Sequence, residues 1–203
     1  MSKETRIEFH KKMNSMNEKE YIESYLTYTL APVIAGYKPA STINLSKVSK
    51  WNPRCKSFIE ELGLEYILLR EELNTVIILV YRRDLLEGYV QESVNRQFLL
   101  KLGYHEFVSL DEDLLKLRER YNLYHCPHEL GVFLGFPIDD VEDFMECTSK
   151  KCLLCGYWQV FNDKEKALRT FRLYDESKEY VANNLLDGLE INQIVASLRQ
   201  IAI

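Results

Sequence analysis

Two β-rich runs near the middle of the chain form its clearest pattern. Tyr66–Glu71 and Thr75–Arg82 are separated only by residues 72–74, which predicts an antiparallel hairpin. The second run contains VIILVY, in which apolar residues stand at consecutive rather than alternating positions. A strand of this kind buries both faces, so we expect it at the centre of a sheet that helices cover on at least one side. A short extended segment is also predicted over Thr42–Leu45.

Helical periodicity and helix-end signals account for most of the remaining chain. Pro32 is expected to close the first of these helices. Polar pairs spaced three residues apart, Ser109 with Glu112 and Asn162 with Glu165, indicate the starts of two others. The predicted helices cover residues 18–32, 53–62, 84–102, 109–121, 127–134, 138–146, 162–187 and 191–201.

This order of elements predicts a single α+β domain, mostly helical, around a small and largely antiparallel sheet built on the central hairpin. Leu153–Phe161 is predicted to add a further strand. The domain is expected to span residues 16–203, and the polar residues 1–15 are expected to form a loose N-terminal arm. The sequence contains no internal repeat and no Gly/Ser-rich linker that would divide it.

Composition narrows the class of protein. Apolar residues make up 46% of the chain, which is enough for a buried core. The formal net charge of -5 disfavours nucleic acid as the main partner, because phosphate binding needs clustered Lys and Arg. The N-terminus lacks the apolar core of a signal peptide, and no apolar run reaches the roughly 18 residues of a membrane span. Five cysteines, an odd number, favour free thiols, so we expect a cytoplasmic protein with no membrane attachment.

Candidate functional residues gather between Cys126 and Phe161. Most prolines and glycines in this stretch fall at predicted helix ends. Gly131 does not, and a glycine inside a helix costs about 1 kcal/mol relative to alanine, so it predicts close packing against another backbone. Tyr157 and Trp158 are neighbours on the predicted strand and therefore point to opposite faces, which favours only one of them as a core residue.

The spacing of glycines and apolar residues over 129–141 is similar to a helix-turn-helix, which would make this stretch a DNA reader. The second helix, residues 138–146, carries five acidic side chains and neither Lys nor Arg. Phosphate groups would repel such a helix along its length, so DNA binding is disfavoured.

A thiol or metal site is a second interpretation. Cys147, Cys152 and Cys155 have a C-x4-C-x2-C spacing found in one class of iron–sulfur protein. Possible further ligands of zinc or a cluster are His125, Cys126 and His128. Against this interpretation, the chain has no second paired cysteine motif. Cys155 would also lie inside an apolar strand, where a buried thiol packs well.

Nucleophilic or acid–base catalysis is a third interpretation, based on His128 and Glu129 with Cys126 or Cys155. No second histidine follows four residues after His128, because position 132 is valine, so the zinc-protease motif is incomplete. Adjacent residues on a helix point about 100° apart, which prevents these two side chains from serving one small site. The chain also lacks a phosphate-binding glycine loop and a nucleophile elbow. The sequence therefore favours a protein without enzymatic activity.

Several segments together resemble one protein family: Leu30-Ala31-Pro32, Gly36-x-Lys38-Pro39-Ala40-Ser41, Val80-Tyr81-Arg82, the run from Pro127 to Val141, and Cys155-Gly156-Tyr157-Trp158. These motifs, PHELG-x2-LG-x-P-x2-DV and CGYW among them, resemble domain-of-unknown-function family 3793, found mainly in Firmicutes such as Clostridia. The resemblance implies a one-domain cytoplasmic bacterial protein and a context of iron or redox metabolism, with no established activity or cofactor. It carries over His128, Glu129, Gly131, Gly135, Pro137, Cys155, Gly156, Tyr157 and Trp158 as motif residues without roles. Cys147 and Cys152 are not part of the pattern.

We therefore expect a non-enzymatic binding protein whose site lies where the start of the His128 helix meets the strand that carries Trp158. The ligand would be a small molecule or a redox partner protein, and the density of glycine, aromatic and histidine residues motivates this placement. The candidate binding residues are His128, Glu129, Gly131, Gly156, Tyr157 and Trp158. The alternative is a zinc or iron–sulfur site at His128, Cys147, Cys152 and Cys155.

Overall fold

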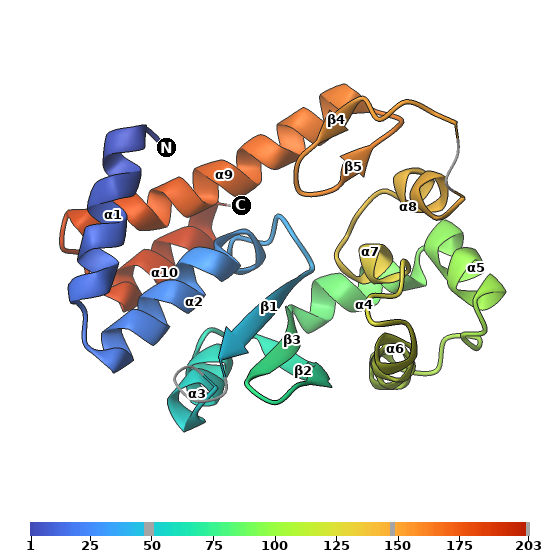
Figure 1. Ribbon diagram of the computed structural model, residues 1–203, viewed down its shortest axis with the longest axis horizontal. Coiled ribbons are helices and arrows are strands. Elements are labelled where there is room, and N and C mark those ends of the chain that lie inside the picture. The colour runs from blue at the N-terminus through green and yellow to red at the C-terminus, as the bar shows by residue number, and fades with distance from the viewer. Residues whose placement is uncertain (47–50, 147–148, 202–203) are drawn as a thin grey trace.

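The computed structural model describes residues 1–46, 51–146 and 149–201 (Figure 1). The helices are α1 (Lys3–Ser15), α2 (Glu18–Ile34), α3 (Pro53–Glu61), α4 (Arg83–Gln91), α5 (Ser93–Lys101), α6 (Leu110–Tyr124), α7 (Leu130–Phe133), α8 (Ile138–Met145), α9 (Lys164–Leu186) and α10 (Ile191–Ile201). The strands are β1 (Ala40–Ser46), β2 (Glu65–Glu71), β3 (Thr75–Tyr81), β4 (Leu154–Cys155) and β5 (Gln159–Val160).

The predicted hairpin is confirmed and forms the centre of the main sheet. Strands β1, β3 and β2 lie in that order, and β3 pairs antiparallel with both neighbours. The strand expected at the centre is therefore central. The register places Ile78 opposite Ile43 of β1 and Leu68 of β2, and an irregularity in β2 follows between Leu68 and Arg70.

Helices cover both faces of this sheet, which explains why β3 is apolar at consecutive positions. Val76, Ile78 and Val80 pack with α1, α2, α3, α9 and α10. Leu79 and Tyr81 point to the opposite face and pack with α4, α5, α6, α7 and α8. In Figure 1 the first group of helices lies on the left and the second on the right. The α+β class and the mostly helical content are confirmed.

Residues 1–15 differ from the loose arm that the sequence predicted. They form α1, which the side chain of Ser2 caps by accepting a hydrogen bond from the Thr5 amide. Phe9 and Met13, one helical turn apart, are buried in the main core. The apolar stripe of α1 is too narrow to be seen in the sequence, and its helix is stabilised by tertiary packing, as is general for short helices. The N-terminal ammonium group also pairs with Glu179 of α9 at 2.7 Å.

Several helix boundaries differ from those expected. The helix predicted over residues 127–134 is shorter, because α7 begins only at Leu130, and α6 continues to Tyr124. Pro32 lies inside the last turn of α2, which continues to Ile34. The helix predicted over residues 84–102 is two helices, because the backbone is extended at Glu92. Asp163 rather than Asn162 caps α9 by accepting a hydrogen bond from the Lys166 amide. In the described part of the chain, no helix is both long and apolar enough to cross a membrane.

The single strand expected over Leu153–Phe161 is wrong. This segment folds into a tight hairpin, in which the two-residue strands β4 and β5 pair antiparallel in a sheet of their own. The chain reverses between them, where the Gly156 amide donates to the Trp158 carbonyl oxygen at 3.0 Å. The hairpin packs against the first half of α9 through Trp158 and Val160 (Figure 1). Alternation of side chains along one strand therefore does not apply to this segment.

Candidate functional site

A pocket of about 450 Å³ lies between the α7–α8 region and the β4–β5 hairpin. Most of its wall is apolar, and the polar groups His128, Asp140 and Gln159 interrupt it. The remaining lining residues are Cys126, Pro127, Leu130, Gly131, Leu134, Phe136, Val141, Phe144 and Trp158. Both the volume and the apolar character are typical of sites that take small organic molecules.

Glycine at position 131 allows the two short helices to meet beside this pocket. A Cβ atom there would lie 2.8 Å from Cγ2 of Val141 and 3.3 Å from Cδ2 of Phe136. The close packing expected at Gly131 is therefore present, although it is against side chains rather than another backbone. Gly135 then makes the turn into α8 with φ at 76°, a conformation that glycine adopts without strain.

Asp140, the aspartate of the family motif, joins α8 to the hairpin, although it was not among the candidate site residues. Its carboxylate is 4% exposed and accepts four hydrogen bonds. One oxygen accepts from the Trp158 indole at 2.8 Å, and the other accepts from the Phe161 amide at 2.9 Å. That second oxygen also accepts from the amide and the side chain of Asn162. The wall of the pocket that contains Trp158 is thus held by one buried carboxylate.

Aromatic packing fixes the indole plane of Trp158. Its ring stacks on Phe136, with centroids 5.2 Å apart, and meets Phe171 of α9 edge-on at 4.5 Å. Only 8% of Trp158 is exposed. The ring is therefore held on both sides while it contributes to the pocket surface.

Two exposed rings lie at the mouth of the pocket. His128 is exposed, and its ring centroid lies 5.2 Å from that of Phe144, whose side chain is 44% exposed. These two residues and Trp158 come from three separate segments of the chain. They offer a ligand aromatic surface at the mouth and in the wall of one pocket.

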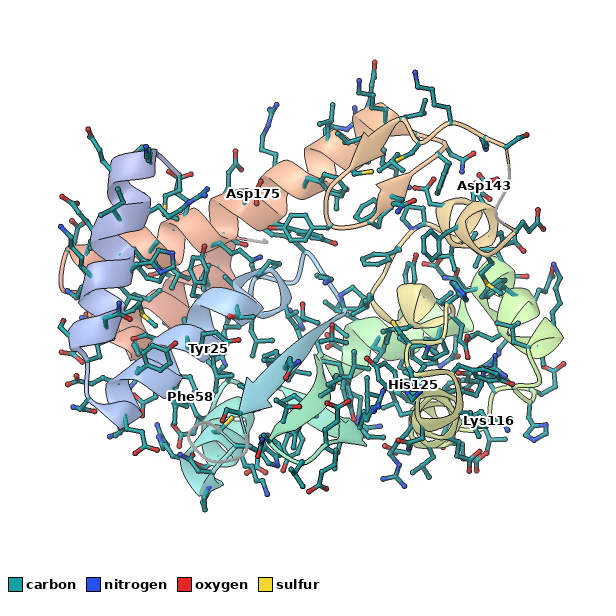
Figure 2. The ribbon with its side chains drawn as sticks, in the orientation of Figure 1. Tyr25, Phe58, Lys116, His125, Asp143 and Asp175 are labelled. Atoms are coloured by element: carbon teal, nitrogen blue, oxygen red, sulfur yellow. The ribbon has the colours of Figure 1, made fainter. Side chains whose placement is uncertain are left out.

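The other candidate residues have structural contacts outside the pocket lining. Glu129 is 1% exposed and forms an ion pair with Arg120 of α6. The Tyr157 hydroxyl donates to Asp175 of α9 at 2.8 Å, and burial, followed by this carboxylate, raises the pKa of Tyr157. Figure 2 shows Asp175 on α9 and Asp143 on α8, on either side of the hairpin. Asp143 accepts a hydrogen bond from the side chain of Asn162 at 2.8 Å, so both ends of the hairpin are anchored.

Gly156 lies directly against the ring of Phe171. A Cβ atom at this position would be 2.2 Å from Cε2 of that ring. We expect Gly156→Ala to lower the free energy of unfolding by about 1–3 kcal/mol, because overpacking displaces a buried ring. Gly88→Ala is the matched control, since nothing lies within 4 Å of a Cβ there. Urea denaturation of both variants tests this expectation, and equal stability of the two would contradict it.

Comparison with protein families identifies the chain. The model of the family described as "Protein of unknown function (DUF3793)" matches residues 26–195, which is most of the sequence. The chain belongs to the DUF3793 family. Comparisons with curated proteins and with solved structures found no match. The matched region of this DUF3793 chain includes the whole pocket and the hairpin beside it.

In this DUF3793 chain, the prediction that Cys155 is a buried thiol is wrong. Cys155 is exposed, and its sulfur lies 3.2 Å from that of Cys152. Cys147 of the suggested metal set lies outside the described residues. Among the residues that are described, no three His, Cys, Asp or Glu side chains come together as metal ligands would.

Lys38 belongs to a motif segment of the family, but it was not among the candidate site residues. Its side chain is 8% exposed, and its ammonium group lies 3.2 Å from the Ser41 hydroxyl oxygen. The group faces the rings of Phe136 and Tyr174, at 5.6 and 5.9 Å from their centroids. Burial, and then repulsion by Lys178, lowers the pKa of Lys38 to about 7. The motif segment marks Lys38 without indicating that its ammonium group is buried, because the rings around it come from distant parts of the chain.

Proposed function

We propose that this protein is a cytoplasmic binding protein without enzymatic activity, which holds a small, flat and largely apolar molecule in the pocket beside Trp158. The observation that carries the proposal is the pocket itself, whose apolar wall and aromatic mouth are built by α7, α8 and the β4–β5 hairpin. Transfer of an apolar ligand surface from water to such a wall provides the free energy of binding.

The polar groups of the pocket indicate the kind of ligand. Asp140 is fully engaged by its own hydrogen bonds and has little capacity left for a ligand. His128 and Gln159 are exposed and supply donors or acceptors at the rim. A ligand with an apolar ring and a polar group at one edge matches this distribution. A concave pocket also suits a small molecule better than the flat surface of a redox partner protein.

The test uses Trp158 as its own reporter. The chain contains two tryptophans, so Trp51→Phe leaves only Trp158 to fluoresce. In that background, we expect the apolar dye 8-anilinonaphthalene-1-sulfonate to bind with one-to-one stoichiometry and to quench the Trp158 emission by energy transfer. Binding with no change in Trp158 emission would place the dye elsewhere and contradict the proposal.

Removal of the mouth rings should weaken this binding. We expect His128→Ala combined with Phe144→Ala to raise the Kd for the dye about tenfold, because two aromatic contacts of about 0.5–1.5 kcal/mol each are lost. Leu168→Ala is the matched control, since Leu168 is a 43% exposed apolar residue on α9 outside the pocket. An unchanged Kd in the double variant would remove these rings from the site.

A further inference from the structure

Two cysteine sulfurs lie in contact along the first arm of the β4–β5 hairpin. Sγ of Cys152 lies 3.2 Å from Sγ of Cys155, and also 3.3 Å from the Leu154 carbonyl oxygen. Since the S–S bond of a disulfide is about 2.05 Å long, the two sulfurs need to approach by only about 1.2 Å to be joined. Cys155 is exposed and Cys152 is partly exposed, so solvent reagents reach the pair.

The other described cysteines lack this arrangement. Cys55 is fully buried, and burial raises its pKa to about 11, so it is an unreactive core thiol. Cys126 is exposed and lies in the pocket wall. Among the described cysteines, only Cys152 and Cys155 have sulfur atoms within hydrogen-bonding distance of each other.

We propose that Cys152 and Cys155 form a reversible dithiol–disulfide couple that exchanges with low-molecular-weight disulfides such as oxidised glutathione. The thiolate of Cys155, the more exposed of the two, attacks one sulfur of the reagent, forms a mixed disulfide and releases one thiol. The thiolate of Cys152 then attacks the Cys155 sulfur, which forms the Cys152–Cys155 bond and releases the second thiol. The two protein thiols lose two electrons and two protons, and the reagent disulfide takes up both to become two thiols.

The hydrogen bond between the two sulfurs makes this exchange dependent on pH. The contact with Cys152, together with a smaller effect of desolvation, raises the pKa of Cys155 above its ordinary value. The thiolate is the attacking species, so it is scarce at neutral pH and the rate should rise about tenfold per pH unit below that pKa. The couple is thus a slow one at pH 7, unlike a thiol activated at a helix N-terminus.

The couple adjoins the pocket but does not depend on the proposed ligand. Cys155 pairs with Gln159 in the β4–β5 register, and Gln159 lines the pocket. The bond would join a residue just before β4 to the last residue of β4, so it would close a small loop within one arm of the hairpin, beside its turn. The inference stands on the sulfur geometry alone, so loss of ligand binding would not affect it.

The experiment treats the full chain, in a Cys126→Ser and Cys147→Ser background, with oxidised glutathione at pH 8. We expect the three remaining thiols to fall to one, with the intact mass lower by two hydrogen atoms and a peptide that links Cys152 to Cys155. Three persisting thiols, or stable glutathione adducts on both cysteines without a link between them, would overturn the proposal.

Single variants in the same background test the order of attack. We expect Cys152→Ser to accumulate a glutathione adduct on Cys155, because the resolving thiol is absent. Cys155→Ser should form an adduct on the less exposed Cys152 at least several-fold more slowly. Adducts that form equally fast in both variants would contradict the assigned order. In the chain with all five cysteines, a disulfide from either residue to Cys126 or Cys147 in place of the Cys152–Cys155 bond would overturn the pairing itself.

Discussion

Asp140→Ala is expected to lower the free energy of unfolding by about 3–5 kcal/mol. The substitution leaves the indole N–H of Trp158 and the amide of Phe161 without their acceptor, and both of these hydrogen bonds are buried. An unsatisfied buried donor costs about 1–3 kcal/mol. The hydrogen bonds to Asn162 add less, because Asn162 is exposed and water can replace the carboxylate there. The hairpin should also loosen, since Asp140 connects it to α8.

Asp139→Ala provides a matched control for this prediction. Asp139 precedes Asp140 in the same first turn of α8, so both variants lose one negative charge at the same end of the helix dipole. Asp139 is exposed, and its loss should cost less than about 1 kcal/mol. Urea denaturation gives both values, and the Trp158 emission maximum should move to longer wavelength only in Asp140→Ala. Equal stabilities of the two variants would show that the carboxylate of Asp140 has no structural role.

The contrast between these two neighbours shows where sequence patterns stop being informative. Both aspartates follow a proline at a helix start, and helix-end chemistry explains both of them equally well. What distinguishes Asp140 is a set of donors on residues 158–162, which the local pattern of α8 does not contain. The central hairpin was predictable for the opposite reason. Its strands, turn and apolar faces all lie within one short stretch of sequence.

The hairpin at β4–β5 illustrates a second limit. Apolar residues over 153–161 favoured one strand, and the expected burial of Cys155 followed from that assignment. The ring of Phe171 lies against Gly156, where the chain turns, and Phe171 belongs to a helix that comes later in the sequence. In the sequence, a turn that depends on tertiary packing therefore cannot be distinguished from part of a continuous strand. The side-chain directions inferred from such a strand are then wrong.

The candidate site was predictable in part, and the same distinction between local and long-range contacts explains which part. Proline and glycine punctuation indicated the two short helices, and the structure brings His128, Gly131 and Trp158 to one pocket. Glu129, Gly156 and Tyr157 instead contact Arg120, Phe171 and Asp175. The candidate residues that lie close together in the sequence therefore include two kinds. Some line the pocket, and the others hold the neighbouring helices and the hairpin in place. Lys38 approaches the back of Phe136 from a distant loop, which no pattern in residues 126–161 reveals.

Lys38→Met is expected to raise the free energy of unfolding by about 4 kcal/mol at pH 7. Burial lowers the pKa of Lys38 from 10.5 to about 7, and each pKa unit corresponds to about 1.4 kcal/mol. Between these two pH values the unfolded chain holds a proton that the folded chain has released. Stability therefore increases with pH across this window, and the cost of burying the charge is complete below pH 7. Methionine fills a similar volume and carries no charge.

The dependence on pH separates this effect from a general improvement in packing. The stability gained by Lys38→Met should be largest at pH 6–7 and should decline as the pH rises towards 10.5, above which the wild-type side chain becomes neutral in both states. Lys11→Met is the control, because Lys11 is exposed on α1 and its loss should change stability by less than about 0.5 kcal/mol. Urea denaturation of the three proteins at pH 6.5, 8 and 9.5 measures the difference directly. A gain in stability that stays constant with pH would mean that Lys38 keeps an ordinary pKa. A loss of stability at pH 7 would mean that the hydrogen bond of Lys38 to Ser41 and its contacts with Phe136 and Tyr174 outweigh the cost of burying the charge.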